Sequence, residues 1–159
     1  DFTGGGTQYG DPLYFSGLKV TGDPGVAVDT NWGLGVKSSR WDTSQVDGGG
    51  PNETLSFLFD QTVELVSVMF GNVQYNDDFS LSVNGIAQGT ADIPGGNVFN
   101  FASGYYTGNL FGFGVQGNND DYYIAGISVN TVDVPEPSSL ALLGLGLAGL
   151  GFSRRKSKA

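Results

Sequence analysis

Carboxylate and amide side chains gather in three short stretches of the sequence, and these residue types are suited to binding a metal ion. The first stretch holds Asp42, Asp47, Asn52 and Glu53, the second is Asn76-Asp77-Asp78, and the third is Asn118-Asn119-Asp120-Asp121. Ca²⁺ takes roughly six to eight oxygen ligands, which carboxylates, amides and loop carbonyls supply. The sequence therefore favours a Ca²⁺ site, for which the candidate ligands are Asp42, Asp47, Asp77, Asp78, Asp120 and Asp121.

A simpler interpretation of the same stretches stays open. None of them has the spacing of an EF-hand loop, which requires acidic or amide residues at alternate positions, a central Gly and a closing Glu. Asn and Asp also favour turns whether or not a metal is present. Solvated turn residues are thus the alternative to a calcium site.

Aromatic side chains provide a second kind of candidate site, because their faces can stack on sugar rings. Alternation along a strand turns one member of each pair, Tyr105-Tyr106 and Tyr122-Tyr123, toward the core. The candidate stacking residues are therefore Trp41, Tyr105 and Tyr122. Together with Ca²⁺, they would make the protein a calcium-dependent carbohydrate-binding module.

The composition of the 159-residue chain excludes several classes of function. It has no His and no Cys, which rules out a Ser-His-Asp triad, a Cys nucleophile and a His-bound or Cys-bound zinc. The formal charge of −9 argues against a nucleic-acid partner. Glycoside hydrolysis needs only two carboxylates, but the neighbours in Asp77-Asp78 and Asp120-Asp121 would point to opposite faces of a strand. We therefore expect a protein that is not an enzyme.

The body of the chain has the pattern of a β protein. Leu55, Phe57 and Phe59 fall on one face of a strand, and the Asn84-Gly85 pair after residues 79–83 is typical of a hairpin turn. We expect eight or nine short strands, of which eight are residues 15–20, 32–36, 54–59, 63–70, 79–83, 98–101, 110–115 and 122–129. Since no crossover helix is evident, the fold class is all-β, an antiparallel β-sandwich of jelly-roll type.

Charge divides the sequence into two segments. Residues 1–133 have three basic and fifteen acidic side chains, a net −12, whereas residues 134–159 have four basic and one acidic, a net +3. We predict a β-sandwich domain over 1–133 and a separate tail over 134–159. The chain begins at Asp1 without Met, which favours a processed or truncated start.

The tail has three parts in a fixed order. Val134-Pro135-Glu136-Pro137 comes first, the uncharged run Leu140–Phe152 follows, and Arg154-Arg155-Lys156 ends it. The prolines interrupt strands and helices, and the apolar run predicts a hydrophobic C-terminal helix slightly shorter than the roughly 20 residues of a comfortable membrane span. Basic residues after it predict a cytoplasmic C-terminus with the body across the membrane. A permanent tail anchor is one interpretation.

This ordered tail resembles the PEP-CTERM sorting signal of Gram-negative bacteria that often produce exopolysaccharide. The resemblance implies that exosortase, a membrane Cys protease and transpeptidase, recognises Pro135, Glu136 and Pro137, while Leu140–Phe152 is a transient membrane segment and Arg154 and Arg155 are its stop. It also implies export to the cell surface or to the extracellular matrix of a biofilm, in a structural or adhesive role. Exopolysaccharide or further copies of the chain would be the partners there.

Overall fold

A computed structural model describes residues 1–3 and 7–132 of the chain. The predicted C-terminal helix and the sorting-signal residues Pro135, Glu136, Pro137, Arg154 and Arg155 lie outside these residues. The predicted domain boundary at 133/134 falls at the edge of the described part and is not tested by it. Within 1–3 and 7–132, no helix is long and apolar enough to span a membrane.

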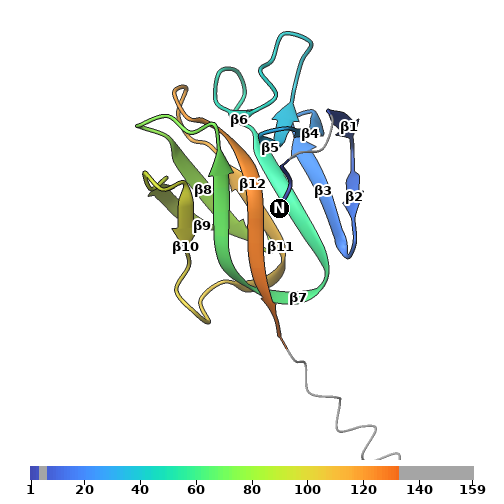
Figure 1. The fold of residues 1–159 in the computed structure, drawn as a ribbon, viewed down its shortest axis with the longest axis vertical. Helices are drawn as coiled ribbons and strands as arrows, with labels where there is room; N and C mark the ends of the chain where they lie inside the picture. The colour runs from blue at the N-terminus through green and yellow to red at the C-terminus, as the bar shows by residue number, and fades with distance from the viewer. Residues whose placement is uncertain (4–6, 133–159) are drawn as a thin grey trace, which may run out of the picture.

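All regular secondary structure in the described residues is β (Figure 1). The strands are β1 (Gln8–Gly10), β2 (Leu13–Phe15), β3 (Leu18–Asp23), β4 (Val26–Thr30), β5 (Gly33–Lys37), β6 (Val46–Asp47), β7 (Thr54–Gly71), β8 (Asp78–Val83), β9 (Ile86–Asp92), β10 (Val98–Asn100), β11 (Thr107–Gly114) and β12 (Asp121–Thr131). They form an antiparallel sheet with the main order β1-β4-β5-β12-β7-β11-β8-β9, to which β2, β3, β6 and β10 add at the sides.

Strand β7 joins the two layers of the molecule. Its first part, from Thr54 to Phe59, pairs with β3 and β11. Its last part, from Val63 to Gly71, pairs with β12 and β10. Figure 1 shows β7 curving at the lower end of the body, so that the sheet folds over and its two halves face each other.

The core lies between these facing halves and is rich in aromatic rings. Phe70 of β7 lies 5.0 Å from Phe79 of β8, centroid to centroid, and Phe79 lies 5.0 Å from Phe99 of β10. The hydroxyl of the fully buried Tyr122 donates to the Gly114 carbonyl at 2.9 Å, which links β12 to β11. Edge-to-face and tilted rings of this kind contribute about 0.5–1.5 kcal/mol per pair beyond their buried area.

The all-β, antiparallel fold confirms the prediction from sequence, whereas the strand order does not confirm a jelly roll. Two predicted short strands, 54–59 and 63–70, are one strand in the structure. The polar residues Asp60, Gln61 and Thr62 between them form the bend of β7 rather than a loop. At the predicted Asn84-Gly85 turn both residues have positive φ, 51° and 78°, as a two-residue hairpin between β8 and β9 requires.

Candidate functional site

The three acidic stretches, far apart in the sequence, meet at the end of the sheet that is uppermost in Figure 1. Asp47 of β6 pairs with Asp121 of β12, which brings the first stretch to the third. The backbone N–H of Asp78 donates to Asp120 Oδ1 at 3.3 Å, which brings the second stretch to the third. The structure thus places all six predicted carboxylates on neighbouring segments.

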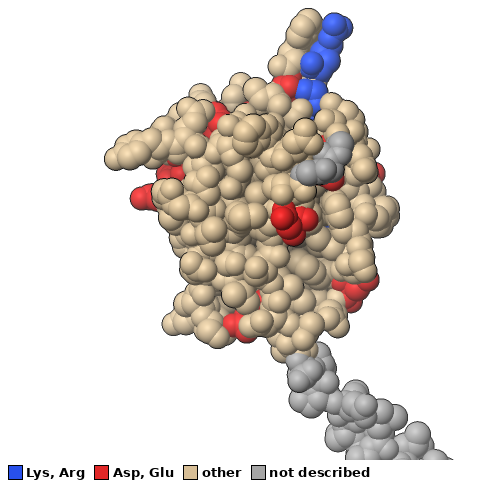
Figure 2. Space-filling view, viewed as in Figure 1, with Lys and Arg blue, Asp and Glu red and all other residues tan. Residues whose placement is uncertain are grey.

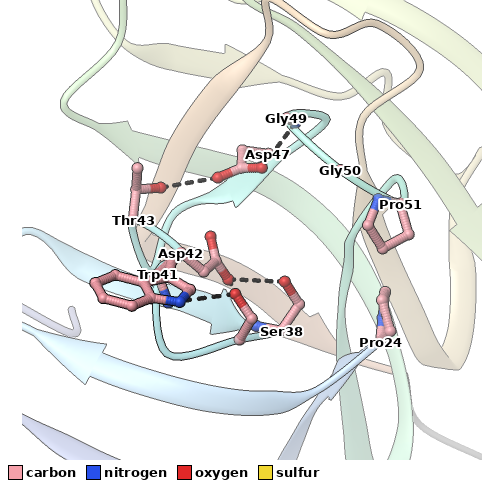
Figure 3. Close-up of a pocket in the computed structure, with 10 residues that line it drawn as sticks. Pro24, Ser38, Trp41, Asp42, Thr43, Asp47, Gly49, Gly50 and Pro51 are labelled. Carbon is pink, nitrogen blue, oxygen red and sulfur yellow. Dashed lines mark hydrogen bonds between the residues drawn. The ribbon is translucent and has the colours of Figure 1, made fainter.

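The first site at this end is a groove of about 450 Å³, here called the Trp41 groove (Figure 3). It lies between the segment after β5 and the loop after β6. Its lining residues are Pro24, Ser38, Ser39, Trp41, Asp42, Thr43, Asp47, Gly49, Gly50 and Pro51.

Hydrogen bonds hold both half-buried carboxylates of the Trp41 groove, Asp42 and Asp47, in place. Asp42 Oδ2 accepts from the backbone N–H and the hydroxyl of Ser38 at 2.6 and 3.0 Å. Asp47 accepts from the Thr43 hydroxyl at 2.8 Å and from the Gly49 N–H at 2.9 Å, as Figure 3 shows. Burial raises the pKa of Asp42, but the hydrogen bonds from Ser38 outweigh it and hold that pKa below its usual value.

A third carboxyl group, that of Glu53, lies beneath this groove. One oxygen from each of Asp42, Asp47 and Glu53 lies within 4.8 Å of the others, so three hard oxygen ligands converge. Only 1% of Glu53 is exposed, and burial together with the charges of Asp42 and Asp47 raises its pKa to about 7. A cation between the three groups would offset their mutual repulsion.

The second site is a groove of about 700 Å³ at the same end, here called the Tyr75 groove. It lies between the turn before β8 and the segment after β9. Its lining residues are Val73, Gln74, Tyr75, Asn76, Asp77, Asp78, Asp92, Ile93, Pro94, Gly95 and Asn97. Asp78 and Asp92 are directly opposite each other in the β8–β9 pair, and burial together with the charges of Asp92 and Asp120 raises the pKa of Asp78.

The predicted stacking residues divide into two exposed rings and one buried ring. Trp41 is 83% exposed in its groove, with the Arg40 guanidinium 4.4 Å from the centre of its ring. Tyr105 is 79% exposed but lines neither acidic groove. The prediction for Tyr122 is wrong, because its ring is fully buried in the core and no sugar can reach it.

Sequence reasoning missed three residues of these sites. Glu53 belongs to the first acidic stretch but is not among the six predicted ligands. Its position directly before the predicted strand 54–59 was the available signal that it could be buried. Asp92 is brought to Asp78 only by the β8–β9 hairpin register. Tyr75, fully exposed beside the second groove, directly precedes the stretch Asn76-Asp77-Asp78, and this adjacency was the available signal.

Charge is unevenly distributed over the face drawn in Figure 2. Acidic side chains are scattered over it, whereas basic side chains gather at the upper end. Of the described basic residues, Lys37 ends β5 and Arg40 follows it in the loop. The Lys37 ammonium donates to the backbone carbonyl of Asp42.

Comparison with known proteins assigns one segment of the chain. Residues 133–156 match the family described as the PEP-CTERM protein-sorting motif. The match covers the Pro-Glu-Pro sequence, the apolar run and the basic cluster Arg154-Arg155-Lys156. No curated protein matches the chain.

Proposed function

We propose a function from the premise that this chain carries a PEP-CTERM protein-sorting motif and is an exported protein sorted through exosortase. Its β-rich body is a non-catalytic structural or adhesive component of the bacterial surface or biofilm matrix. The single observation that carries the proposal is the motif at residues 133–156. The tail inserts transiently in the membrane, exosortase cleaves it near Pro135-Glu136-Pro137, and the mature body leaves the membrane.

The geometry of the Trp41 groove supports a role without catalysis. Glycoside hydrolysis by two carboxyl groups requires a separation of roughly 5–10 Å, with both groups in reach of the sugar. The one carboxyl group of this site with a strongly raised pKa, Glu53, is buried. A buried carboxyl cannot protonate a glycosidic oxygen in the groove.

Mass spectrometry of the protein recovered from a host with an active exosortase tests the processing. We expect the mature chain to lack Phe152 and the basic end, and we expect Glu136→Ala with Pro137→Ala to leave the full-length precursor in the membrane fraction. Pro51→Ala, which changes a proline of the body, is the matched control and should be processed normally. A surface-exposed mature chain that retains Phe152 would identify a permanent anchor and contradict the processing.

Adhesion by self-association is supported by strand β9. It is the last strand of the sheet order, pairs with β8 alone among the described strands, and has exposed side chains along most of its length. Such an edge presents unpaired backbone groups to a second chain. Sedimentation of the full chain tests this: concentration-dependent association should disappear in Thr90→Pro, and a monomer at all concentrations would contradict it.

A second candidate function is calcium-dependent carbohydrate binding in the Trp41 groove. The observation that favours it is the presence, in one groove, of an exposed indole ring and the carboxylates of Asp42 and Asp47 (Figure 3). The carboxyl group of the buried Glu53 converges on these two carboxylates. A bound Ca²⁺ would accept sugar hydroxyls as ligands while a pyranose ring stacks on Trp41.

Thermal melting in EDTA and then in excess Ca²⁺, followed by a glycan array in each condition, tests this candidate. We expect Ca²⁺ to raise the melting temperature of the full chain and to be required for glycan binding. Asp42→Asn should lose calcium-dependent glycan binding, whereas Asp60→Asn, at the exposed bend of β7, should retain it. Glycan binding that persists in EDTA, or no binding in either condition, would contradict the candidate.

A further inference from the structure

One carboxylate oxygen of the Tyr75 groove has no hydrogen-bond partner. Asp77 is only 2% exposed, and its Oδ1 is fully enclosed and unpartnered. Its other oxygen, Oδ2, accepts from the backbone N–H of Gln74 at 2.5 Å. A buried charged group left without a partner is strongly destabilising, so Asp77 calls for a counter-charge.

The groups around Asp77 are acidic. Asp120, itself mostly buried, reaches over from the loop before β12 and accepts from the N–H of Asp78 at 3.3 Å and from the N–H of Gly117 at 3.1 Å. Asp78 follows Asp77 directly and faces Asp92 across the β8–β9 pair. Burial raises the pKa of Asp77, and the charges of Asp121 and Asp120 raise it further.

Protein side chains do not supply the missing positive charge. No residue that lines the Tyr75 groove is a Lys or an Arg. The basic residues of the described part of the chain are Lys19 on β3, Lys37 on β5 and Arg40 in the loop after β5. The side-chain amide of Gln74 donates to Asp121, at 3.0 and 3.1 Å, and not to the unpartnered Oδ1 of Asp77.

We propose that Asp77 and Asp120 bind a Ca²⁺ ion that ties the turn before β8 to the loop before β12. The free Oδ1 of Asp77 is the central ligand. Asp120 adds a carboxylate from the other segment, and loop carbonyls and water complete the shell of oxygen ligands that Ca²⁺ takes. This site is separate from the Trp41 groove and depends neither on glycan binding nor on sorting.

Thermal melting of the full chain in mild detergent, after removal of metal with EDTA, tests the site. Adding Ca²⁺ at about 100 times its dissociation constant should raise the melting temperature by roughly 5–10 °C. In a chain that also carries Asp42→Asn, so that the Trp41 groove is altered, the rise should be absent once Asp77→Asn or Asp120→Asn is added. It should persist in Asp42→Asn, which alters only the Trp41 groove, and in Asp60→Asn, which removes one remote charge.

The behaviour without metal separates an ion site from a shared proton. In EDTA at pH 7, Asp77→Asn should melt at or above the wild-type temperature, because the variant removes an unpaired buried charge. In Ca²⁺ the order should reverse. A wild type that does not respond to Ca²⁺ but gains stability as the pH falls would show that a proton satisfies Asp77, and it would overturn the proposal.

Two further outcomes are decisive. A Ca²⁺ response that Asp77→Asn retains and Asp42→Asn loses would assign the ion to the Trp41 groove and overturn the second site. If Asp77→Asn fails to fold, Tb³⁺ luminescence in an Asp42→Asn/Asp47→Asn chain decides the matter. Tyrosine-sensitised emission that Ca²⁺ displaces and Asp120→Asn abolishes supports the site, whereas no emission contradicts it.

Discussion

Asp47 of β6 lies directly opposite Asp121 of β12 in an antiparallel pair. Side chains opposite each other in such a pair share one face of the sheet, with Cβ atoms about 4.5–5.5 Å apart. Asp47 lines the Trp41 groove, and Asp121 raises the pKa of Asp77 in the Tyr75 groove. The pair therefore joins the two acidic sites and concentrates negative charge where they meet.

Removing one charge of this pair should stabilise the metal-free protein. We expect Asp121→Asn to raise the free energy of unfolding in EDTA by about 0.5 kcal/mol, because like charges directly opposite are unfavourable and Asn keeps an oxygen for Gln74 and Gln45. Urea denaturation at pH 7 measures the change, with the exposed Asp60→Asn as control. A gain in Asp60→Asn of the same size would show that net charge, not this pair, is responsible.

The raised pKa of Glu53 predicts that its contribution to stability depends on pH. Burial, with the charges of Asp42 and Asp47, shifts its pKa from 4.5 to about 7 in the folded protein. The folded state then binds the proton more tightly than the unfolded state, so this stabilisation is complete below about pH 4.5 and is lost as the pH rises to about 7. Between pH 5 and pH 8 the loss should be about 2 kcal/mol, allowing for solvent screening.

Comparing Glu53→Gln with the wild type in EDTA isolates this effect. Glu53→Gln should lose less stability than the wild type from pH 5 to pH 8, because Gln has no proton to release. Burial also raises the pKa values of Asp29, Asp77 and Asp78, and these groups impose the same trend on both proteins. Parallel pH profiles for the two proteins would contradict the assignment to Glu53.

Gly48 sets how closely the loop after β6 approaches the loop after β11. A Cβ placed on Gly48 would lie 1.8 Å from the carbonyl oxygen of Gly117, so Gly48→Ala forces the two loops apart. We expect a loss of about 1–3 kcal/mol in urea denaturation. Gly50→Ala in the same loop meets nothing within 4 Å and should cost far less. Equal losses in both variants would show that the close approach to Gly117 does not explain the glycine.

The hydroxyl of Tyr122 stabilises the core by a hydrogen bond, a role that differs from the stacking role predicted from the sequence. Tyr122→Phe keeps the buried ring but removes the 2.9 Å hydrogen bond to the Gly114 carbonyl. We expect a loss of about 1–2 kcal/mol, since a buried acceptor is left unsatisfied. Tyr105→Phe, at a 79% exposed position, should change the unfolding free energy by less than about 0.5 kcal/mol. An unchanged stability in Tyr122→Phe would mean that water replaces the hydroxyl.

The sequence predicts the fold class and the types of residue at the acidic end of the sheet. It does not predict which of these acidic residues lie next to one another. Alternation in 54–59 and 79–83 is a local property, so it predicts strands correctly. The approach of Asp47 to Asp121 and of Asp78 to Asp92 is a matter of strand register between distant segments. No local pattern contains that register.

The burial of individual residues likewise could not be predicted from the local alternation of polar and apolar residues. Alternation predicts that only one of Tyr122 and Tyr123 is buried, yet both are. Tyr122 packs against Phe70 in the core. Tyr123 lies against Gly35 and Gly71, which have no side chains, on the neighbouring strands β5 and β7. Glu53, which directly precedes β7, is also buried: its backbone N–H donates to the Asp47 carbonyl and its carbonyl accepts from the Val115 N–H, so it lies between β6 and the end of β11. Position within the sheet, which emerges only from the whole fold, overrode the pattern at these residues.

Substitution of Trp41 tests carbohydrate binding without a large change in the stability of the fold. Because its side chain is 83% exposed and its ring lies against the surface residue Arg40, Trp41→Ala should change the unfolding free energy by less than about 0.5 kcal/mol. Any glycan found on the array should bind roughly two- to tenfold more weakly to this variant, since an aromatic stacking contact supplies about 0.5–1.5 kcal/mol. Tyr105→Ala removes an equally exposed ring outside both grooves and should bind the glycan as the wild type does. Equal weakening by the two variants would place the sugar elsewhere, and unchanged binding in Trp41→Ala would remove the Trp41 groove as the glycan site.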